Sequence, residues 1–239
     1  MKPLVVITGA SSGIGAASAR AFSQAGHPLL LVARRLDRMV ELSLPRTLCK
    51  SVDVLDIDSF TGAVTEAEKL FGPVDLLINN AGYMNMEHTA VQSPGEWRKQ
   101  FDINCVGLLN CTSVIFPTMI KRQHGTIINV GSTAGRTIYD NHTAYNGTKH
   151  AVHAMSEALR REGSPHNVRV IVVAPGMVDS ELTQGTTNEE ILSARLEYEH
   201  TIGGALHGSD VAQAMLFAYQ RPQNVCLWEL VVAPTKQTY

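Results

Sequence analysis

Short, uninterrupted apolar runs recur along the chain and alternate with longer amphipathic stretches. The runs are rich in Val, Ile and Leu and lack polar alternation, which is typical of strands covered on both faces. They span residues 4–7, 29–32, 76–78, 126–130 and 168–173, and residues 227–232 are expected to add an edge strand. Strands that alternate with helices predict an α/β fold, a doubly wound parallel sheet of the Rossmann type with helices on both faces.

Turn and capping residues mark where helices begin and end between these runs. A first helix is expected over about 13–25, ended by Gly26, and another over about 59–71, ended by Gly72. Ser93-Pro94-Gly95-Glu96 has the pattern of a capping box with proline at the first helical position, so a long helix is expected to begin there. No repeat or linker interrupts the pattern, and residues 1–239 are expected to form a single dinucleotide-binding and catalytic domain.

Composition narrows the classes of protein that this sequence can represent. The chain of 239 residues has 20 Lys and Arg against 22 Asp and Glu, a formal net charge of −2 that argues against binding nucleic acid or anionic membranes. The N-terminal apolar run is too short for a signal peptide, and no stretch approaches the roughly 18 apolar residues of a spanning helix. Cysteines at positions 49, 105, 111 and 226 form no Cys-x-x-Cys pair, and His150 and His153 lack a third ligand at metal spacing. We expect a cytoplasmic protein with reduced thiols and no metal site.

A glycine-rich turn follows the first apolar run and opens the first expected helix. Its residues are Thr8, Gly9, Ala10, Ser11, Ser12, Gly13, Ile14 and Gly15. Glycines at such a junction allow backbone N–H groups and the helix N-terminus to approach a pyrophosphate. The spacing differs from the usual G-x-G-x-x-G, and a plain tight turn is the alternative interpretation.

Two arginines follow the second apolar run, about 20 positions beyond the glycine turn. At this place a dinucleotide fold usually has Asp or Glu to bind a free ribose 2′-hydroxyl, or Arg to bind a 2′-phosphate. Here Arg34 and Arg35 occupy it, which predicts NADP(H) rather than NAD(H) because a guanidinium pairs bidentately with phosphate. The alternatives are that Asp37 reads the ribose, or that both arginines are merely solvated.

Polar groups also follow two later apolar runs. Asn79-Asn80-Ala81-Gly82 comes after one run, and Ser132 lies just beyond another. The carboxyl ends of parallel strands border the crevice where α/β sheets bind ligands, so both segments are candidates for the site. An ordinary turn and an ordinary loop serine are the alternatives.

Tyr145 and Lys149 are four residues apart in a stretch with helical apolar spacing, so they share one helix face. An ammonium one turn from a phenol favours the phenolate, which would lower the tyrosine pKa toward the range of a general acid/base. An exposed Tyr and Lys without chemical function is the alternative for such a pair.

Asn104 falls on one stripe of the helix expected from Ser93, together with Trp97, Phe101 and Leu108. A buried amide needs hydrogen-bond partners, so Asn104 either satisfies backbone groups or holds ordered water in a site. The sequence alone favours the structural role slightly.

In combination these motifs resemble the classical short-chain dehydrogenase/reductase family along nearly the whole chain. The T-G-x-x-x-G-x-G turn, N-N-A-G, an Asn, and a Ser thirteen residues before Y-x-x-x-K all match, as does P-G-x-V-x-T with serine in place of the last threonine. The resemblance implies that Asn104, Ser132, Tyr145 and Lys149 are catalytic. It implies a cofactor site made of Thr8, Gly9, Ser11, Ser12, Gly13, Ile14, Gly15, Arg34, Arg35, Asp53, Val54, Asn80, Ala81, Gly82, Tyr145, Lys149, Pro175, Gly176, Val178 and Ser180.

The roles that the resemblance implies are those of an NADP(H)-dependent oxidoreductase acting on a small carbonyl or alcohol. Tyr145 exchanges the proton, Lys149 lowers its pKa and holds the nicotinamide ribose, Ser132 polarises the substrate oxygen, and Asn104 supports a water relay. Residues at about 177–206 would form a substrate flap.

Stretches at 33–42, 129–135 and 228–239 are similar to the NADP-dependent 3-hydroxy acid dehydrogenases that act on L-serine and L-allo-threonine. The family also implies a homotetramer or homodimer, with contact faces near 95–120 and 143–162. The competing hypothesis is a non-catalytic dinucleotide-binding redox regulator. A methyltransferase on a related sheet is a further alternative, but it would have no use for Tyr145.

Overall fold

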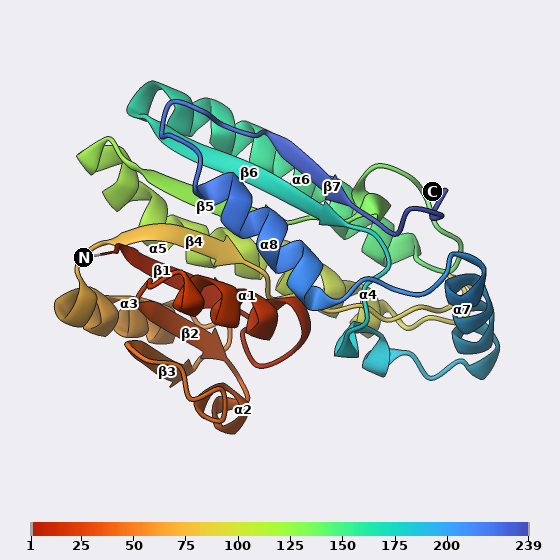
Figure 1. Cartoon of the computed structure of the whole chain (residues 1–239). Helices are drawn as coiled ribbons and strands as arrows, with labels where there is room; N and C mark the ends of the chain where they lie inside the picture. The colour runs from red at the N-terminus through yellow and green to blue at the C-terminus, as the bar shows by residue number, and fades with distance from the viewer. Residues whose placement is uncertain (1, 239) are drawn as a thin grey trace.

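The computed structural model describes residues 2–238, and Met1 and Tyr239 lie outside this range. Tyr239 is the last residue of the stretch 228–239 that is similar to the 3-hydroxy acid dehydrogenases. Its centre is a seven-stranded sheet in the order β3-β2-β1-β4-β5-β6-β7, in which every neighbouring pair is parallel (Figure 1). The strands are β1 (Leu4–Thr8), β2 (Leu29–Ala33), β3 (Thr47–Ser51), β4 (Val74–Asn79), β5 (Gly125–Val130), β6 (Val168–Pro175) and β7 (Glu229–Val232). This arrangement confirms the predicted doubly wound α/β fold.

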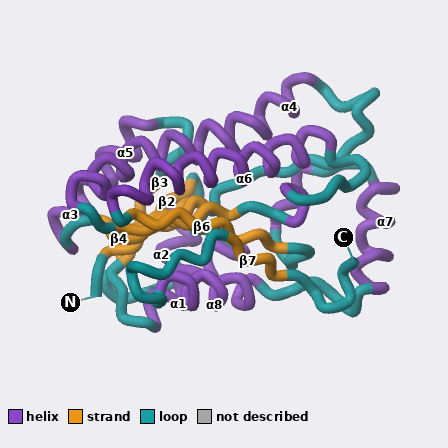
Figure 2. Tube along the Cα trace, turned by 90° about the horizontal axis from the view of Figure 1, so that it is seen from above, coloured by secondary structure: helices purple, strands orange, loops and turns teal. Residues whose placement is uncertain are grey.

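Helices cover both faces of the sheet. Figure 2 shows α1 and α8 on one face and α3, α5 and α6 on the other, while α7 lies beyond the sheet, past the strand ends. The helices are α1 (Gly13–Gln24), α2 (Leu36–Val40), α3 (Ile57–Phe71), α4 (Pro94–Phe101), α5 (Gly107–Arg122), α6 (Thr143–Gly163), α7 (Glu189–Thr201) and α8 (Gly208–Tyr219). Shorter turns are the π-helical η1 (Asp102–Val106) and the 3-10 helices η2 (Thr133–Gly135), η3 (Ser164–His166) and η4 (Glu181–Gly185).

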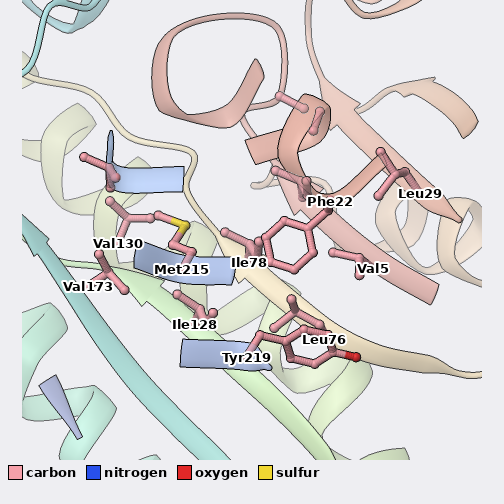
Figure 3. Close-up of a cluster of buried hydrophobic side chains, with 14 of the residues drawn as sticks. Val5, Phe22, Leu29, Leu76, Ile78, Ile128, Val130, Val173, Met215 and Tyr219 are labelled. Carbon is pink, nitrogen blue, oxygen red and sulfur yellow. The ribbon is translucent and has the colours of Figure 1, made fainter. Parts of the chain in front are cut away.

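The apolar runs are continuous because each strand supplies side chains to both helical layers. Val5 and Ile7 of β1 pack with Phe22 of α1 and Met215 of α8, in the cluster drawn in Figure 3. Leu4 and Val6, on the opposite side of the same strand, belong to the cluster that contains α3 and α5. Side chains alternate across a strand, so a strand covered on both faces must be apolar at every position.

The predicted strands are all present, with ends moved by one or two residues, but β3 was not anticipated. Its sequence, Thr-Leu-Cys-Lys-Ser, contains polar residues, and none of its side chains is fully buried. β3 is one of the two edge strands of the sheet and pairs only with β2. A half-covered strand does not need the continuous apolar run that identifies a central strand.

The first two expected helices are confirmed, and the capping box is formed only in part. Glycines in the left-handed region follow both helices, Gly26 with φ +87° and Gly72 with φ +86°. At the start of α4 the Ser93 side chain accepts a hydrogen bond from the Glu96 N–H at 3.4 Å. The Glu96 carboxylate, however, accepts from the Tyr83 hydroxyl at 2.7 Å instead of closing the box on Ser93.

The long helix that begins after Ser93 contains a π-helical turn, η1, between α4 and α5. By length and mean hydropathy the whole run Pro94–Arg122 qualifies as a candidate membrane span, contrary to the expectation from the sequence. Half of the apolar window is buried inside the fold, as in the core helix of a folded domain. The run is therefore weak support for a membrane segment.

All four cysteines are free thiols, as expected, although only Cys105 and Cys111 are fully buried. Within residues 2–238, no group of three or more His, Cys, Asp or Glu side chains is arranged to hold a metal ion.

Arg169 is the main buried charge of the sheet. It lies on β6 opposite Thr126 of β5 and is only 5% exposed. Its guanidinium donates to the Thr126 hydroxyl at 2.8 Å and to the carbonyls of Tyr219 and Arg221 at 2.9 and 3.0 Å. The Tyr219 carbonyl is the last of α8, where a helix leaves its acceptors without intrahelical partners, and Arg221 lies two residues beyond it. Arg169 therefore ties α8 to the sheet.

We expect Arg169→Met to lower the free energy of unfolding by about 2–4 kcal/mol, because buried carbonyls would lose their donors. Urea unfolding at neutral pH measures the change. Arg161→Met is the matched control, since the Arg161 side chain is 75% exposed and its loss should change stability by less than about 0.5 kcal/mol. Equal stabilities of the two variants would contradict this account of α8.

Candidate functional site

A cavity of about 820 Å³ lies at the carboxyl ends of the strands. It extends from the turn after β1 and the loop after β2, across the loops after β4 and β5, to α6 and the segment after β6. The strand order reverses between β1 and β4, and the crevice at such a switch point is the usual ligand site of an open α/β sheet. The volume is within the range of small-molecule and cofactor sites.

The glycine turn fits a pyrophosphate. Gly9 and Gly13 have φ values of +65° and +50°, which favour glycine. A Cβ on Gly15 would lie 2.2 Å from the Gly9 carbonyl oxygen, so the helix can approach the turn only without a side chain there. The first turn of α1 carries no acidic residue, and Ser12 caps it without a side-chain hydrogen bond. Ser12, Gly13 and Ile14 line the cavity, so the N–H groups and the positive dipole end of α1 lie at its wall as a site for an anion.

Thr8 and Asn80 connect the glycine turn to the loop after β4. The Thr8 hydroxyl oxygen accepts from the backbone N–H groups of Asn80 and Ala81, each at 3.0 Å. The Asn80 side chain donates to the Thr8 carbonyl at 2.9 Å and the Gly9 carbonyl at 3.2 Å. Thr8 is 1% exposed and supports the wall of the cavity from behind.

Most of the predicted cofactor residues lie on the cavity wall. They are Gly9, Ser11, Ser12, Gly13, Ile14, Arg34, Arg35, Asp53, Val54, Asn80, Ala81, Gly82, Tyr145, Lys149, Pro175, Gly176, Val178 and Ser180. Thr8 and Gly15 are not among the lining residues and act through the packing just described. The competing Asp37 is not among them either.

Arg35 bridges the loop after β2 and the glycine turn. Its guanidinium donates to the hydroxyl oxygens of Ser11 at 3.3 Å and Ser12 at 3.0 Å. Arg34 lines the same end of the cavity. The Arg35 guanidinium and two hydroxyls thus meet where the sequence predicts that a ribose 2′-phosphate binds, and Arg34 lines the same cavity.

Ser132, Tyr145 and Lys149 meet at the other end of the cavity. Tyr145 and Lys149, one turn apart on α6, are only 6% and 7% exposed. The Lys149 ammonium lies 5.6 Å from the centre of the Tyr145 ring and donates to the Val130 carbonyl at 2.9 Å. Ser132 is the N-cap of η2, two residues after the end of β5, and hydrogen-bonds the Tyr145 side chain.

Burial, rather than Lys149, dominates the protonation of Tyr145. Desolvation raises the pKa of Tyr145 to about 12, and the hydrogen bond with Ser132 acts in the opposite direction. Desolvation also lowers the pKa of Lys149 to about 8. Burial therefore outweighs the lowering of the Tyr145 pKa that the sequence predicts from Lys149, because both groups are removed from water. At neutral pH the phenol is protonated and the amine is charged.

Asn104 has the contacts of a structural residue. It is 2% exposed and lies in η1, where its side-chain oxygen accepts from the Tyr83 N–H at 2.7 Å. Its amide group donates to the Tyr83 carbonyl at 2.9 Å and to the Thr148 hydroxyl at 3.0 Å. It does not line the cavity. The predicted stripe is also interrupted, since Phe101 is 42% exposed where the π turn changes the helix register.

The segment at 177–206 forms a closed loop over the cavity. Val178 pairs with Leu206, and backbone hydrogen bonds from Asp179 to Leu206 at 2.9 Å and from Leu206 to Met177 at 3.0 Å fasten its two ends together. Between these two ends lie η4 and α7, and Figure 1 shows α7 at the right-hand end of the molecule. Ile191 of α7 packs in one apolar cluster with Tyr145 and other residues.

Several residues that line the site were not predicted. Met84 and Met86, in the extended segment after β4, pack in the cluster around Tyr145. Gln237 accepts from the Met177 N–H at 2.9 Å and donates to the Tyr139 hydroxyl at 3.0 Å. Alternating Met residues after N-N-A-G offered a signal for the first pair. The role of Gln237 depends on the path of the C-terminal segment and has no signal in the sequence.

An ion-pair cluster at the arginine end was also missed. Glu181, in the first turn of η4, lies 2.8 Å from Arg35 and 2.5 Å from Arg38. Hydrogen bonds from Arg38 and then from Arg35 hold the pKa of Glu181 below its usual value, so the carboxylate is ionised at neutral pH. The spacing of Arg34, Arg35 and Arg38 at the start of α2 was visible in the sequence, but their acidic partner was not.

Comparison with known proteins agrees with this geometry. An uncharacterized oxidoreductase from Staphylococcus saprophyticus is 33% identical and covers 98% of this chain and 97% of its own. Sulfoacetaldehyde reductase 2 from Chromohalobacter salexigens is also 33% identical, over 100% of this chain and 97% of its own. The closed form of serine dehydrogenase complexed with NADP+ superposes with a TM-score of 0.88 at 30% identity, covering 99% of this chain and 96% of that chain.

The family model for short chain dehydrogenase matches residues 3–191, a segment that contains the glycine turn, the N-N-A-G loop and the Tyr145–Lys149 pair. The sheet order, the cavity at its switch point and these matches lead to one assignment: the chain belongs to the short-chain dehydrogenase/reductase family.

Proposed function

We propose that this protein is an NADP(H)-dependent oxidoreductase that interconverts a small carbonyl compound and its alcohol, with Tyr145, Ser132 and Lys149 as catalytic residues. The observation that carries the proposal is the continuity of one cavity from the glycine turn and its arginines to the Tyr145 hydroxyl. The complex of serine dehydrogenase with NADP+ supports the choice of cofactor. A redox regulator without turnover would have no need for this catalytic set.

In the reductive direction Tyr145 acts as the general acid. Its raised pKa keeps the proton on the phenol until the substrate oxygen develops negative charge. The nicotinamide, when bound, supplies the hydride to the carbonyl carbon. Ser132 donates a hydrogen bond to the substrate oxygen, and the Lys149 charge stabilises the phenolate that remains on Tyr145. In the oxidative direction the same groups act in reverse.

Asn104 is proposed as a positioning residue rather than a group in contact with the reacting atoms. Its hydrogen bonds join the loop after β4 to Thr148, which is next to Lys149 on α6. Through them Asn104 fixes the spacing between two walls of the cavity. Both amide hydrogens of Asn104 are used in these hydrogen bonds, so its side chain would join the predicted water relay toward Lys149 only as an acceptor.

The arginine end is proposed to recognise the 2′-phosphate of NADP(H). Arg35 donates to Ser11 and Ser12, so its guanidinium lies beside the hydroxyl groups that would share the same anion. Arg34 adds a second positive charge on the same wall. A guanidinium pairs bidentately with a phosphate. Asp37 does not line the cavity, so its carboxylate would not contact a ribose hydroxyl there.

The substrate is proposed to be a small compound with an anionic group, such as a 3-hydroxy acid or its oxo form. Arg195, on α7 within the flap, lines the cavity and pairs with Glu199 at 3.3 Å, while Met84, Met86 and Ile191 make the surrounding wall apolar. Two of the similar proteins, sulfoacetaldehyde reductase and serine dehydrogenase, are named for compounds that carry a sulfonate and a carboxylate. A cation beside this apolar wall would orient such a group.

We further propose a cytoplasmic homotetramer or homodimer, formed by the faces of α4–α5 and α6, with residues 177–206 as its substrate flap. Phe101, Val106 and Leu109 support this proposal, since they are 42%, 46% and 41% exposed on the first face. Light scattering on the purified protein measures the assembly directly.

Tyr145→Phe is expected to lower the reductive turnover by about 10²–10⁴-fold, because the change removes the proton donor and retains the ring. The affinity for NADPH should be nearly unchanged. Tyr139→Phe is the matched control, since it removes another phenol from the same cavity and should lower turnover by less than about tenfold. A Tyr145→Phe enzyme that retains more than a tenth of the activity would exclude Tyr145 as the acid.

Arg195→Gln is expected to raise KM for 3-oxo and 3-hydroxy acids by about tenfold or more, because a charged hydrogen bond contributes about 1.5–3 kcal/mol. Reduction of neutral aldehydes and diketones should retain its KM. A panel of both classes with NADPH measures this difference. Equal effects on anionic and neutral substrates would contradict the proposed anionic subsite.

A further inference from the structure

Glu181 holds a position that links the flap to the cofactor end of the cavity. It is the residue after Ser180, at the start of the flap, and its carboxylate pairs with Arg35 at 2.8 Å and Arg38 at 2.5 Å. Arg35 is the same residue that donates to Ser11 and Ser12 of the glycine turn. The Arg35 guanidinium thus contacts both the Glu181 carboxylate of the flap and the glycine turn.

The base of the flap is fixed against that turn. A Cβ on Gly13 would lie 3.3 Å from the Cβ of Ser180, and a Cβ on Gly208 would lie 3.1 Å from the backbone of Gly13. Ser180 near the start of the flap and Gly208, two residues beyond its end, therefore both lie against the glycine turn, and the pair with Arg35 places Glu181 beside it. Glu181 also lines the cavity itself.

We propose that Glu181 is a specificity-determining residue that competes with the ribose 2′-phosphate of NADP(H) for Arg35. This inference rests on the proposed role of Arg35 in cofactor recognition. A carboxylate that already pairs with Arg35 must either yield this guanidinium to the phosphate or remain beside it as a like charge. Either way Glu181 lowers the preference for NADP(H) over NAD(H) and leaves the site less selective than its arginines alone would make it.

Arg38 gives Glu181 a second partner when Arg35 is taken by phosphate. Arg38 donates to the carboxylate from one turn further along α2, and it does not line the cavity. The exchange therefore moves Glu181 from two cations to one rather than leaving a carboxylate unpaired. Such an exchange costs little free energy, as expected of a residue that changes the cofactor affinity by a small factor.

The ion pairs themselves are too exposed to stabilise the fold strongly. The side chains of Arg35 and Arg38 are each 42% exposed, and that of Glu181 is 31% exposed. Surface ion pairs contribute little to folding because water and salt screen them. The neutral, isosteric substitution Glu181→Gln should thus fold normally, and its effect should appear in ligand binding.

The test measures binding of NADPH, NADH and 2′,5′-ADP to the full chain by calorimetry. The probe 2′,5′-ADP carries the phosphate without the nicotinamide, so its affinity does not depend on the catalytic end. Glu181→Gln is expected to tighten NADPH and 2′,5′-ADP by about 3–10-fold at low salt, with NADH changed by less than about twofold. The gain should diminish as salt is added.

Glu87→Gln is the matched control. Glu87 accepts from the flap residue Asn188 at 2.8 Å, so its substitution removes the same charge and another flap contact, but Glu87 does not line the cavity. It should leave the affinity for 2′,5′-ADP unchanged. The inference is overturned if Glu181→Gln leaves 2′,5′-ADP affinity unchanged, weakens it, or changes NADPH and NADH equally.

Arg35→Ala separates failure of this inference from failure of the proposed function. If Arg35→Ala weakens NADPH relative to NADH while Glu181→Gln has no effect, Arg35 reads the phosphate and only the competition is wrong. If Arg35→Ala leaves the ratio of the two affinities unchanged, the assignment of Arg35 itself is wrong.

Discussion

The close contact between the glycine turn and the loop after β4 is the constraint on which the site depends. A Cβ on Gly9 would lie 2.8 Å from the Ala81 Cα, and a Cβ on Gly15 would lie 2.6 Å from the Asn80 side chain. The Thr8 hydroxyl joins the two segments by accepting two of their N–H groups. This contact holds the loops after β1 and β4 against each other. The strand order reverses between these two strands, and the cavity lies at this switch point.

Burial at the other end of that cavity determines what the catalytic groups can do. Both Tyr145 and Lys149 are nearly inaccessible to solvent, so each pKa moves toward the neutral form of its group. The result is a proton donor that stays protonated and a nearby cation of reduced basicity. This combination favours delivery of a proton to a substrate oxygen.

The sequence predicted those features that depend on residue type within one short segment. The central strands could be predicted because both of their faces are covered and their sequences are therefore apolar throughout. The glycine turn and the Tyr145–Lys149 pair could be predicted because their chemistry requires a fixed spacing along the sequence. The edge strand β3 lacked the apolar signal, and the π turn at η1 changed the register that had placed Phe101 beside Asn104. The Arg38–Glu181 pair joins residues 143 positions apart, and no local pattern can predict such a contact.

The central claim, that a protonated Tyr145 beside a charged Lys149 delivers the proton, is tested most directly by the pH dependence of reductive turnover with saturating NADPH. With the pKa of Tyr145 raised to about 12 and that of Lys149 lowered to about 8, the rate should be level from about pH 6 to 7.5. It should fall above about pH 8, as Lys149 loses its charge while Tyr145 keeps its proton. A reductive rate that instead rises through the neutral range would show that a deprotonated group is required and would contradict the account.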